Sequence, residues 1–455
     1  MSVMQDLPGI LKREIRKHQV PGASIAILRN NRILGETAVG VINLDTQVPT
    51  TTDTVFQIGS ISKPHTATLI MQLVDEGLLD LDKPIKEYLP DFRVADLDVS
   101  NRVTARHFLS HQSGIDGDFF VDSGRGDDSI EKLINMATMV PALFPLEAKH
   151  SYCNLGFAVL GRVIEVLTRQ TFDSALKTRI FEPLGMTRAI SLPEDTLRFR
   201  CAIGHVPSQR KKDVWYVTNT PYLSFGQKAA GSTPAMSASD LLRFAQMHMN
   251  GGKNSKGAKV LSMKSVKAMQ RRQIRVAKNT QSAIHGWGLG WFLMDWNGTK
   301  LYGHDGATIG QFAFLRILPE KNLAVALLTN GGDAKGLFDS VFRPIFQGLA
   351  KSSEPVRPVI NENLRVDLNQ YIGSYANMNG QLEFSRSRGK LVVSSRLNGG
   401  GKAFPDRRPV MFIDKQSLSM NTGNPVLDRT MFLFSESDSG RFKFVANGLR
   451  QHRRV

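Results

Sequence analysis

A serine and a lysine three residues apart mark the place where this sequence first suggests chemistry. Residues 56–64 read FQIGSISKP, and from Lys63 to Leu79 the apolar residues recur at helical spacing. Lys63 therefore lies on the same helical face as Ser60, and a serine oxygen at a helix N-terminus lies in a favourable field beside unpaired N–H groups. The pattern predicts a serine nucleophile with a lysine beside it.

The order of the polar groups that follow distinguishes Ser60 from other serines. The spacing Ser-x-x-Lys alone is not specific, because it occurs also at Ser129, Ser174, Ser208 and Ser387. After Ser60, two further motifs follow in the right order, the first of them about ninety residues on. Tyr152-Cys153-Asn154 stands directly before a second helical pattern, and His304-Asp305-Gly306 stands between strand-like runs.

With Gly59 before Ser60, this ordered set resembles the serine β-lactamase and penicillin-binding-protein superfamily, in its class C and D-aminopeptidase/esterase branch (peptidase family S12). The resemblance covers roughly residues 8 to 345. Further stretches that resemble the family are LSHQSG at 109–114, IFEPLGM at 180–186, GST at 231–233, SDL at 239–241, GWGLGW at 286–291 and LTN at 328–330. The resemblance implies an α+β domain, with an antiparallel sheet and a helical cluster, that works through an acyl-enzyme.

Matched motif to motif, the resemblance makes Ser60 the nucleophile, with Lys63 and Tyr152 sharing its proton. Free lysine and tyrosine side chains are mostly protonated at pH 7, so burial must hold one of the two deprotonated, and the sequence leaves open which one. Asn154 would orient Lys63 and donate to the amide carbonyl of the substrate. The backbone N–H groups of Ser60 and Ala307 would form the oxyanion hole.

Gly306 and His304 would complete the substrate-binding set, and His304 is also counted among the catalytic residues. His304 stands where many β-lactamases carry the lysine of a Lys-Thr-Gly motif, a tripeptide that this sequence lacks. An imidazole with its ordinary pKa changes charge between pH 5 and 8, so we expect His304 to bind a substrate carboxylate more firmly as pH falls. Because a neutral or partly charged imidazole binds a carboxylate less firmly than a lysine does, β-lactam hydrolysis is not the first expectation.

Strand-like runs at both ends of residues 1–350 flank a helical middle. A short amphipathic helix and a hairpin, residues 23–28 and 32–39 with a turn at Asn30-Asn31, open the chain. Strand-like runs at 301–302, 312–318 and 323–329 close the region, and helical patterns at 156–168, 172–180 and 238–249 lie between. If the two ends pair, one antiparallel sheet with clustered helices results.

A change in composition after residue 350 predicts a second domain. Residues 351–363, KSSEPVRPVINEN, carry two prolines and predict a linker. Residues 364–455 then alternate β-rich segments with Gly/Asn/Asp turns, which is typical of a small antiparallel barrel or sandwich. The expected strands are 371–375, 381–384, 390–394, 409–413, 430–434 and 441–446. The tail resembles the lipocalin-like domain that follows the catalytic domain in some cytosolic members of the superfamily.

Composition limits the partners. The chain has 455 residues, a formal net charge of +17 and two cysteines. It has no apolar run of the ~18 residues that span a membrane, and its N-terminus has no apolar export-signal core, so we expect a cytoplasmic protein without a membrane partner. Cys153 and Cys201 lack metal-ligand spacing, so no metal or cofactor is expected. The basic residues are spread without an aromatic platform, so nucleic acid is not an expected partner, and a homo-oligomer is left open.

The sequence thus predicts a serine hydrolase that cleaves amide or ester bonds, most of all in short or D-residue-containing peptides. A carboxylesterase, a β-lactamase or DD-carboxypeptidase and a peptide-cyclising acyl transferase stay open as alternatives, because the sequence does not show whether water or an amine resolves the acyl-enzyme. The rival outside catalysis is a scaffold that keeps the fold. The intact set of Ser60, Lys63 and Tyr152 argues against that rival, since a scaffold has no need of a desolvated lysine facing a serine.

Overall fold

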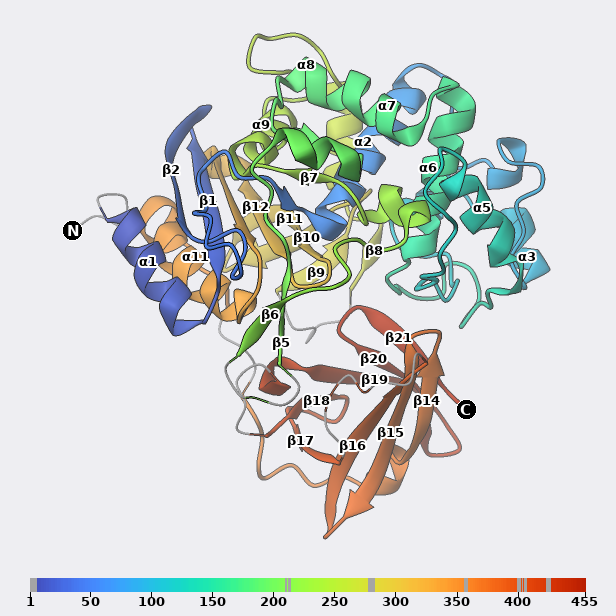
Figure 1. The fold of residues 1–455 in the computed structure, drawn as a ribbon. Coiled ribbons are helices and arrows are strands. Elements are labelled where there is room, and N and C mark those ends of the chain that lie inside the picture. The colour runs from blue at the N-terminus through green and yellow to red at the C-terminus, as the bar shows by residue number, and fades with distance from the viewer. Residues whose placement is uncertain are drawn as a thin grey trace.

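A computed structural model describes residues 6–208, 211, 214–276, 283–355, 359–398, 402, 404, 407–422 and 427–455. The larger part of the structure, called the large domain below, is organised around an eight-stranded antiparallel sheet (Figure 1). In spatial order the strands are β2 (Arg32–Gly40), β1 (Gly22–Arg29), β13 (Leu323–Thr329), β12 (Phe312–Leu318), β11 (Thr299–Ala307), β10 (Phe292–Trp296), β9 (Ile284–Trp287) and β8 (Ile274–Arg275).

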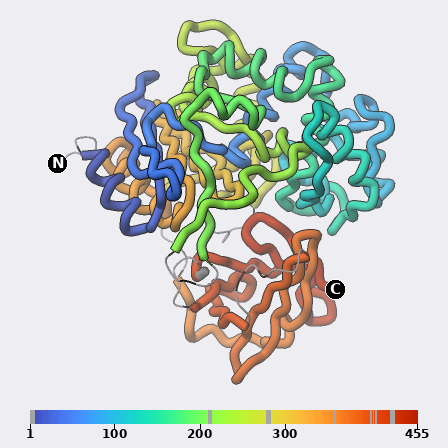
Figure 2. Tube along the Cα trace, in the orientation of Figure 1, coloured from blue at the N-terminus to red at the C-terminus, as the bar shows by residue number. Residues whose placement is uncertain are grey.

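The two ends of this region meet in the sheet, as the sequence predicts. Strand β1 pairs with β13, with Ala26 opposite Ala326, although some 300 residues separate them. Figure 2 shows the blue N-terminal strands beside the orange end of the same region. The predicted hairpin is also confirmed, because Asn30 and Asn31 join β1 to β2 with φ of 49° and 62°, the left-handed values of a tight two-residue turn.

Each face of the sheet covers its own hydrophobic core. Side chains alternate across a strand, so Ile25 and Ile27 of β1 pack toward helices α1 (Leu7–Lys17) and α11 (Ala334–Ala350), while Ala26 and Leu28 pack into the larger core on the opposite face. This two-sided burial explains why β1 is apolar along almost its whole length rather than alternating with polar residues.

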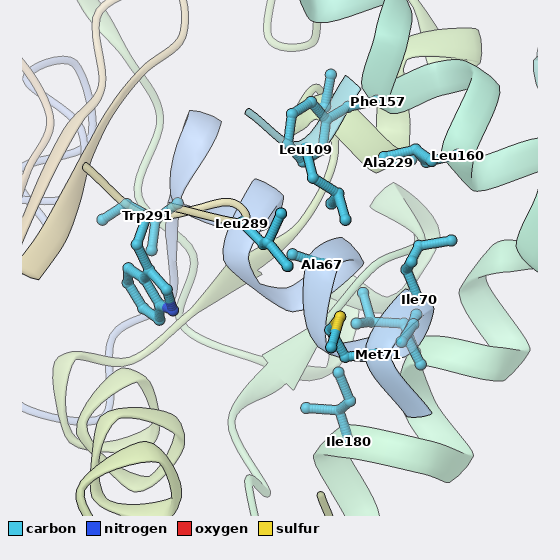
Figure 3. Close-up of a cluster of buried hydrophobic side chains, with 14 of the residues drawn as sticks. Ala67, Ile70, Met71, Leu109, Phe157, Leu160, Ile180, Ala229, Leu289 and Trp291 are labelled. Carbon is cyan, nitrogen blue, oxygen red and sulfur yellow. The ribbon is translucent and has the colours of Figure 1, made fainter. Parts of the chain in front are cut away.

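Helix α2 (Ser62–Asp75) runs through the larger core. Every residue from Ser62 to Leu73 is buried, and Figure 3 shows Ala67, Ile70 and Met71 of this helix among apolar side chains from its neighbours. The other helices are α3 (Leu97–Arg102), α4 (Ala105–Leu109), α5 (Ser129–Met136), α6 (Asn154–Thr168), α7 (Phe172–Leu176), α8 (Glu182–Leu184), α9 (Ala238–Met249) and α10 (Met263–Gln270). The sequence motifs at Ser60 and Tyr152 thus stand at the heads of two buried helices.

Two expectations for this region need correction in detail. The helix predicted at 172–180 is α helical only to Leu176, and residues Lys177–Phe181 form a wider π turn. The strand expected at 301–302 continues through His304 to Ala307, because it pairs along its length with β12. Small strands outside the main sheet are β3 (Phe56–Gln57), β7 (Ala235–Met236) and β4 (Ala189–Ile190) in one group and β5 (His205–Pro207) with β6 (Trp215–Val217) in another.

The tail folds into a closed antiparallel barrel of eight strands. They are β14 (Gly373–Asn377), β15 (Gly380–Ser387), β16 (Lys390–Leu397), β17 (Arg408–Phe412), β18 (Ser417–Met420), β19 (Met431–Asp438), β20 (Arg441–Asn447) and β21 (Arg450–Arg454). Six are the strands that the sequence predicts, while β18 and β21 were not predicted. Strand β21 closes the barrel by pairing with both β20 and β14. Aromatic side chains, among them Tyr375, Phe384 and Phe434, fill its interior.

Two hairpin turns of the barrel are among its contacts with the larger part. The β14–β15 turn bonds Met378 N–H to the Asp116 carboxylate at 2.7 Å. The β20–β21 turn, which faces the larger part in Figure 1, accepts the Tyr152 N–H at Leu449 O at 2.9 Å. Of the predicted linker 351–363, residues 356–358 lie outside the described residues, and the predicted boundaries 1–350 and 364–455 stay a prediction. Within the described part of the chain, no helix combines the length and apolarity that a membrane crossing requires.

Candidate active site

Ser60 lies in a single 3-10 turn, Gly59–Ile61, that leads from β3 into α2. Gly59 has φ of +51°, and a Cβ there would lie only 2.6 Å from the backbone nitrogen of Ala307. Glycine is therefore needed both for the left-handed backbone and for the close approach of strand β11. The turn leaves the Ser60 side chain partly exposed in a cleft, while the helix behind it is buried.

Lys63 is fully buried beneath this serine. Its Nζ lies 3.1 Å from Ser60 Oγ, and it donates to Asn154 Oδ1 at 2.6 Å and to Ala230 O at 2.8 Å. Burial holds the pKa of Lys63 well below its ordinary value, so the neutral amine is favoured. A neutral amine has two N–H donors and one lone pair; the two carbonyl oxygens take the donors, and the lone pair remains for the Ser60 hydroxyl.

Tyr152 stands just before α6, with its ring 4.7 Å from Lys63 Nζ. Burial raises the pKa of its phenol above the ordinary value, an effect that the Ser60 hydroxyl partly offsets. The phenol therefore keeps its proton at neutral pH. The sequence left open which of Lys63 and Tyr152 is the base, and both pKa directions favour the lysine.

The end of strand β11 passes directly over the backbone of Ser60. A Cβ on Gly306 would lie 1.9 Å from Ile58 O and 3.0 Å from Ser60 N, so only glycine allows this contact. The close passage brings the backbone of Ala307 beside that of Gly59 and Ser60. This geometry supports the predicted pair of oxyanion donors, the N–H groups of Ser60 and Ala307, which stays a prediction.

His304 lies in the same strand but differs from the expectation in its charge. Only 3% of the residue is exposed, and its Nδ1 bonds Asp305 O at 2.6 Å. Burial lowers the pKa of His304 to about 3. The ring is therefore neutral from pH 5 to 8, and the expected gain of charge on acidification is wrong. His304 stacks on Phe292 and lines the cleft as a neutral aromatic group.

Asn154 contacts Lys63 as predicted, and it also reveals a group that the sequence did not suggest. Its Nδ2 donates to the Asp118 carboxylate at 2.5 Å, and Asp118 in turn binds Asn379 and Arg450 from the barrel. Since one amide hydrogen already goes to Asp118, the donation of Asn154 to a substrate carbonyl stays a prediction. Asp118 belongs to no motif recognised in the sequence, and Arg450 was one of many basic residues in the tail.

The candidate site opens onto one cleft of about 750 Å³ between the large domain and the barrel. Ser60, Tyr152, His304, Gly306 and Ala307 line its inner end. Its apolar lining comes from Ile284, Trp287, Phe292, Phe312, Phe314 and Leu449.

Cys153, beside Tyr152, is fully buried, and burial raises its thiol pKa to about 11, which confirms it as a packed residue. Over the residues that the structure describes, no group of three His, Cys, Asp or Glu side chains is arranged to hold a metal ion.

Known proteins share both the sequence and the fold of this chain. Residues 6–348 match the family model described as Beta-lactamase. Penicillin-binding protein 4 of Amycolatopsis lactamdurans is 43% identical over 339 residues, which cover 73% of this chain and 87% of that protein. The crystal structure of SurE with D-Leu has a TM-score of 0.78 and 25% identity over 99% of both chains. The octameric penicillin-binding protein homologue from Pyrococcus abyssi has a TM-score of 0.65 and 22% identity over 99% of this chain and 100% of its own. This chain therefore belongs to the β-lactamase family.

Proposed function

We propose that this protein is a serine hydrolase that forms an acyl-enzyme on Ser60 and acts on amide or ester bonds of short or D-residue-containing peptides. The observation that carries the proposal is the contact between Ser60 Oγ and a fully buried Lys63, which donates to two carbonyl oxygens and whose pKa burial holds well below its ordinary value. A serine hydroxyl is a weak nucleophile until a neighbouring base takes its proton. Lys63 is that base.

The reaction uses the remaining groups in turn. As the bond from Ser60 Oγ to the carbonyl carbon forms, the hydroxyl proton moves to Lys63 Nζ, and the oxyanion accepts from the N–H groups of Ser60 and Ala307. The bond to the leaving amine or alcohol then breaks, and that group takes a proton through the Tyr152 hydroxyl, which Lys63 reprotonates. Water then takes the place of the leaving group. It attacks the acyl carbon while its proton passes through Tyr152 to Lys63, and Lys63 returns a proton to Ser60 Oγ as that bond breaks and the acid leaves.

The cleft and the relatives support the choice of substrate. A volume of about 750 Å³ suits a short peptide rather than a protein chain. The apolar lining around Trp287, Phe292 and Leu449 favours an apolar side chain next to the scissile bond. The SurE structure, similar over 99% of this chain, holds D-Leu, which supports D-residue substrates, and the name of the Amycolatopsis protein supports reaction with penicillin.

The experiment is intact-protein mass spectrometry after treatment with a fluorophosphonate and, separately, with benzylpenicillin. We expect one covalent adduct, mapped to Ser60, and none in Ser60→Ala. A panel of dipeptide p-nitroanilides with D or L residues before the scissile bond then tests substrate class, with higher kcat/KM expected for the D series. The absence of any adduct would favour the scaffold alternative.

The fate of the acyl group is a separate question with a direct measurement. Hydrolysis and acyl transfer share the first half of the reaction, so the same acyl-enzyme precedes both. Incubation of a peptide ester with rising concentrations of a D-amino acid amide separates them, because only transfer yields the coupled peptide.

The cytoplasmic location and self-association of the protein stay predictions. Light scattering of the purified protein tests self-association.

A further inference from the structure

A continuous set of polar contacts leads from the barrel to the candidate nucleophile. Arg450, at the start of β21, pairs with the Asp118 carboxylate through its guanidinium, and Asn379 of the β14–β15 turn donates to the same carboxylate. Asp118 accepts from Asn154 Nδ2 at 2.5 Å, and Asn154 Oδ1 accepts from Lys63 Nζ at 2.6 Å. Only 4% of the Asp118 side chain is exposed, so these partners replace water around it.

We propose that Asp118 and Arg450 are a positioning pair for this active site: Asp118 fixes which end of the Asn154 amide faces Lys63, and Arg450 balances the Asp118 charge so that Lys63 stays a neutral base. The inference rests on the proposed function, in which Lys63 takes the Ser60 proton. It assigns the barrel a part in the chemistry, although the barrel does not supply the nucleophile or the base.

The first half of the proposal follows from the donors and acceptors. An ionised carboxylate only accepts hydrogen bonds, so the NH₂ end of the Asn154 amide must face Asp118. Its oxygen then faces Lys63, where it accepts from Nζ. If Asp118 gained a proton, it could donate, and the amide would be free to turn. Burial favours that proton, whereas Arg450 opposes it, and the pKa of Asp118 stays below its ordinary value.

The second half follows from the charges around Lys63. Besides Asp118 and Arg450, the titratable side chains around it on other elements are those of Tyr152, Cys153, His111 and His304. Burial favours the neutral form of each of them, since it raises the pKa of the phenol and the thiol and lowers that of both imidazoles. Among the groups acting on Lys63, the charges are therefore the Arg450 cation, which disfavours its protonation, and the Asp118 anion, which favours it.

The barrel holds Arg450 in a defined place. Leu449 O accepts the Tyr152 N–H, and Gln451 N–H donates to Ser151 Oγ at 3.2 Å, so the residues on both sides of Arg450 are bonded to the segment that carries Tyr152. The guanidinium carbon also lies 4.9 Å from the centre of the Tyr152 ring. Docking of the barrel therefore brings the arginine to a position that the large domain alone does not supply.

The test is the pH dependence of kcat/KM for a neutral p-nitrophenyl ester in the full-length protein. The acid limb reports protonation of Lys63, so a change in its charge environment moves that limb. Arg450→Met removes the cation and should move the limb to higher pH, by about 0.5 to 1 unit, less than the shift expected of a charge in direct contact. Asp118→Asn removes the anion and should move it to lower pH. The double variant should lie near wild type.

Two further variants separate charge from shape. Arg450→Lys keeps the cation without the forked contact, so its acid limb should stay near that of wild type while kcat falls. Arg429→Met is the matched control, because Arg429 is also a barrel arginine that lines the cleft but pairs with Asp333, and it should leave the limb in place. Loss of rate in Arg450→Met and Asp118→Asn without opposite movements of the limb would overturn the proposal.

Failure of this inference is distinguishable from failure of the proposed function. If wild type forms no Ser60 adduct, or if Lys63→Ala keeps its rate, the proposed function is wrong. If wild type does form the Ser60 adduct, Lys63→Ala loses its rate and the acid limbs nevertheless coincide, only the role of Asp118 and Arg450 is wrong. Asp118→Asn preserves the size and shape of the side chain, so if Arg450→Met does not accumulate as folded protein, the direction of the Asp118→Asn shift alone decides.

Discussion

The two walls of the cleft are built in different ways. The large-domain wall carries Ser60 and Tyr152, with Lys63 buried beneath the serine, and all three belong to short sequence motifs near the N-termini of the buried helices α2 and α6. The barrel wall carries Asn379 and Arg450, which come from two hairpin turns and belong to no motif. In the proposed reaction, bond making relies on groups that the core immobilises, whereas the proposed positioning pair adjusts the charge around them from the barrel. The difference predicts that changes in the first wall abolish the reaction and changes in the second modulate it.

The largest effect is expected from Ser60→Ala and Lys63→Ala. Each should lower kcat/KM for a p-nitrophenyl ester at least about a thousandfold, and the double variant should be no slower than either single one, because the two groups act as one unit. Stability should change little in Ser60→Ala, since the serine side chain forms no cap at this helix start. A double variant much slower than either single variant would show that the two residues work independently.

Tyr152→Phe should have the next largest effect. The phenol passes a proton to the leaving group, and loss of such a group costs about a hundredfold or more in rate. Because Lys63 remains the base, the acid limb of the pH profile should persist in this variant. Esters with a good leaving group should suffer less than p-nitroanilides. If the acid limb disappeared instead, Tyr152 rather than Lys63 would be the base.

Prediction from sequence followed the same division between the two walls. The main sheet, the helical middle and the Ser60, Lys63 and Tyr152 set were predictable, because apolar periodicity and motif order are local signals. Asp118 was not, since nothing in a lone carboxylate indicates that a second domain will pair with it. The meeting of residues more than 300 positions apart depends on how the barrel docks.

Strand β21, which the sequence did not predict, shows most clearly why such contacts are hard to predict from sequence. Its sequence, RQHRR, has no apolar alternation, and only one of its five residues is buried. It forms a strand because it closes the barrel against β20 and β14, a tertiary constraint that overrides weak β propensity. The expectation for the charge of His304 was wrong for a similar reason. An ordinary pKa belongs to a free side chain, whereas burial lowers the pKa of this imidazole.

His304 gives a prediction with a smaller effect than Tyr152. Because its imidazole is neutral from pH 5 to 8, kcat/KM for benzylpenicillin and for a neutral ester should show the same pH dependence in wild type. His304→Gln should lower both values by a similar factor, since it removes ring packing on Phe292 but no charge. A selective loss for penicillin that grows as pH falls would show that the ring does gain a proton and binds the carboxylate.

The smallest effect on rate, with a clear effect on stability, is expected from Asp116→Asn at the barrel contact. Burial raises the pKa of Asp116 to about 7, well above its value of 3.8 in an unfolded chain. Between pH 4 and 7 the folded protein keeps a proton that the unfolded chain loses, so this group lowers stability as pH rises through that range. The asparagine variant cannot lose that proton, and it still offers an oxygen to the Met378 N–H.

Urea unfolding at pH 5 and pH 8 measures this difference. Relative to wild type, Asp116→Asn should gain about 3 kcal/mol of stability between the two pH values, because each pH unit over which the folded state alone is protonated contributes about 1.4 kcal/mol. The control is Asp98→Asn, a carboxylate of α3 that is 60% exposed, and it should keep the wild-type pH dependence. If the two variants behave alike, burial does not raise the pKa of Asp116 in the folded protein, and the carboxyl does not hold its proton between pH 5 and 7.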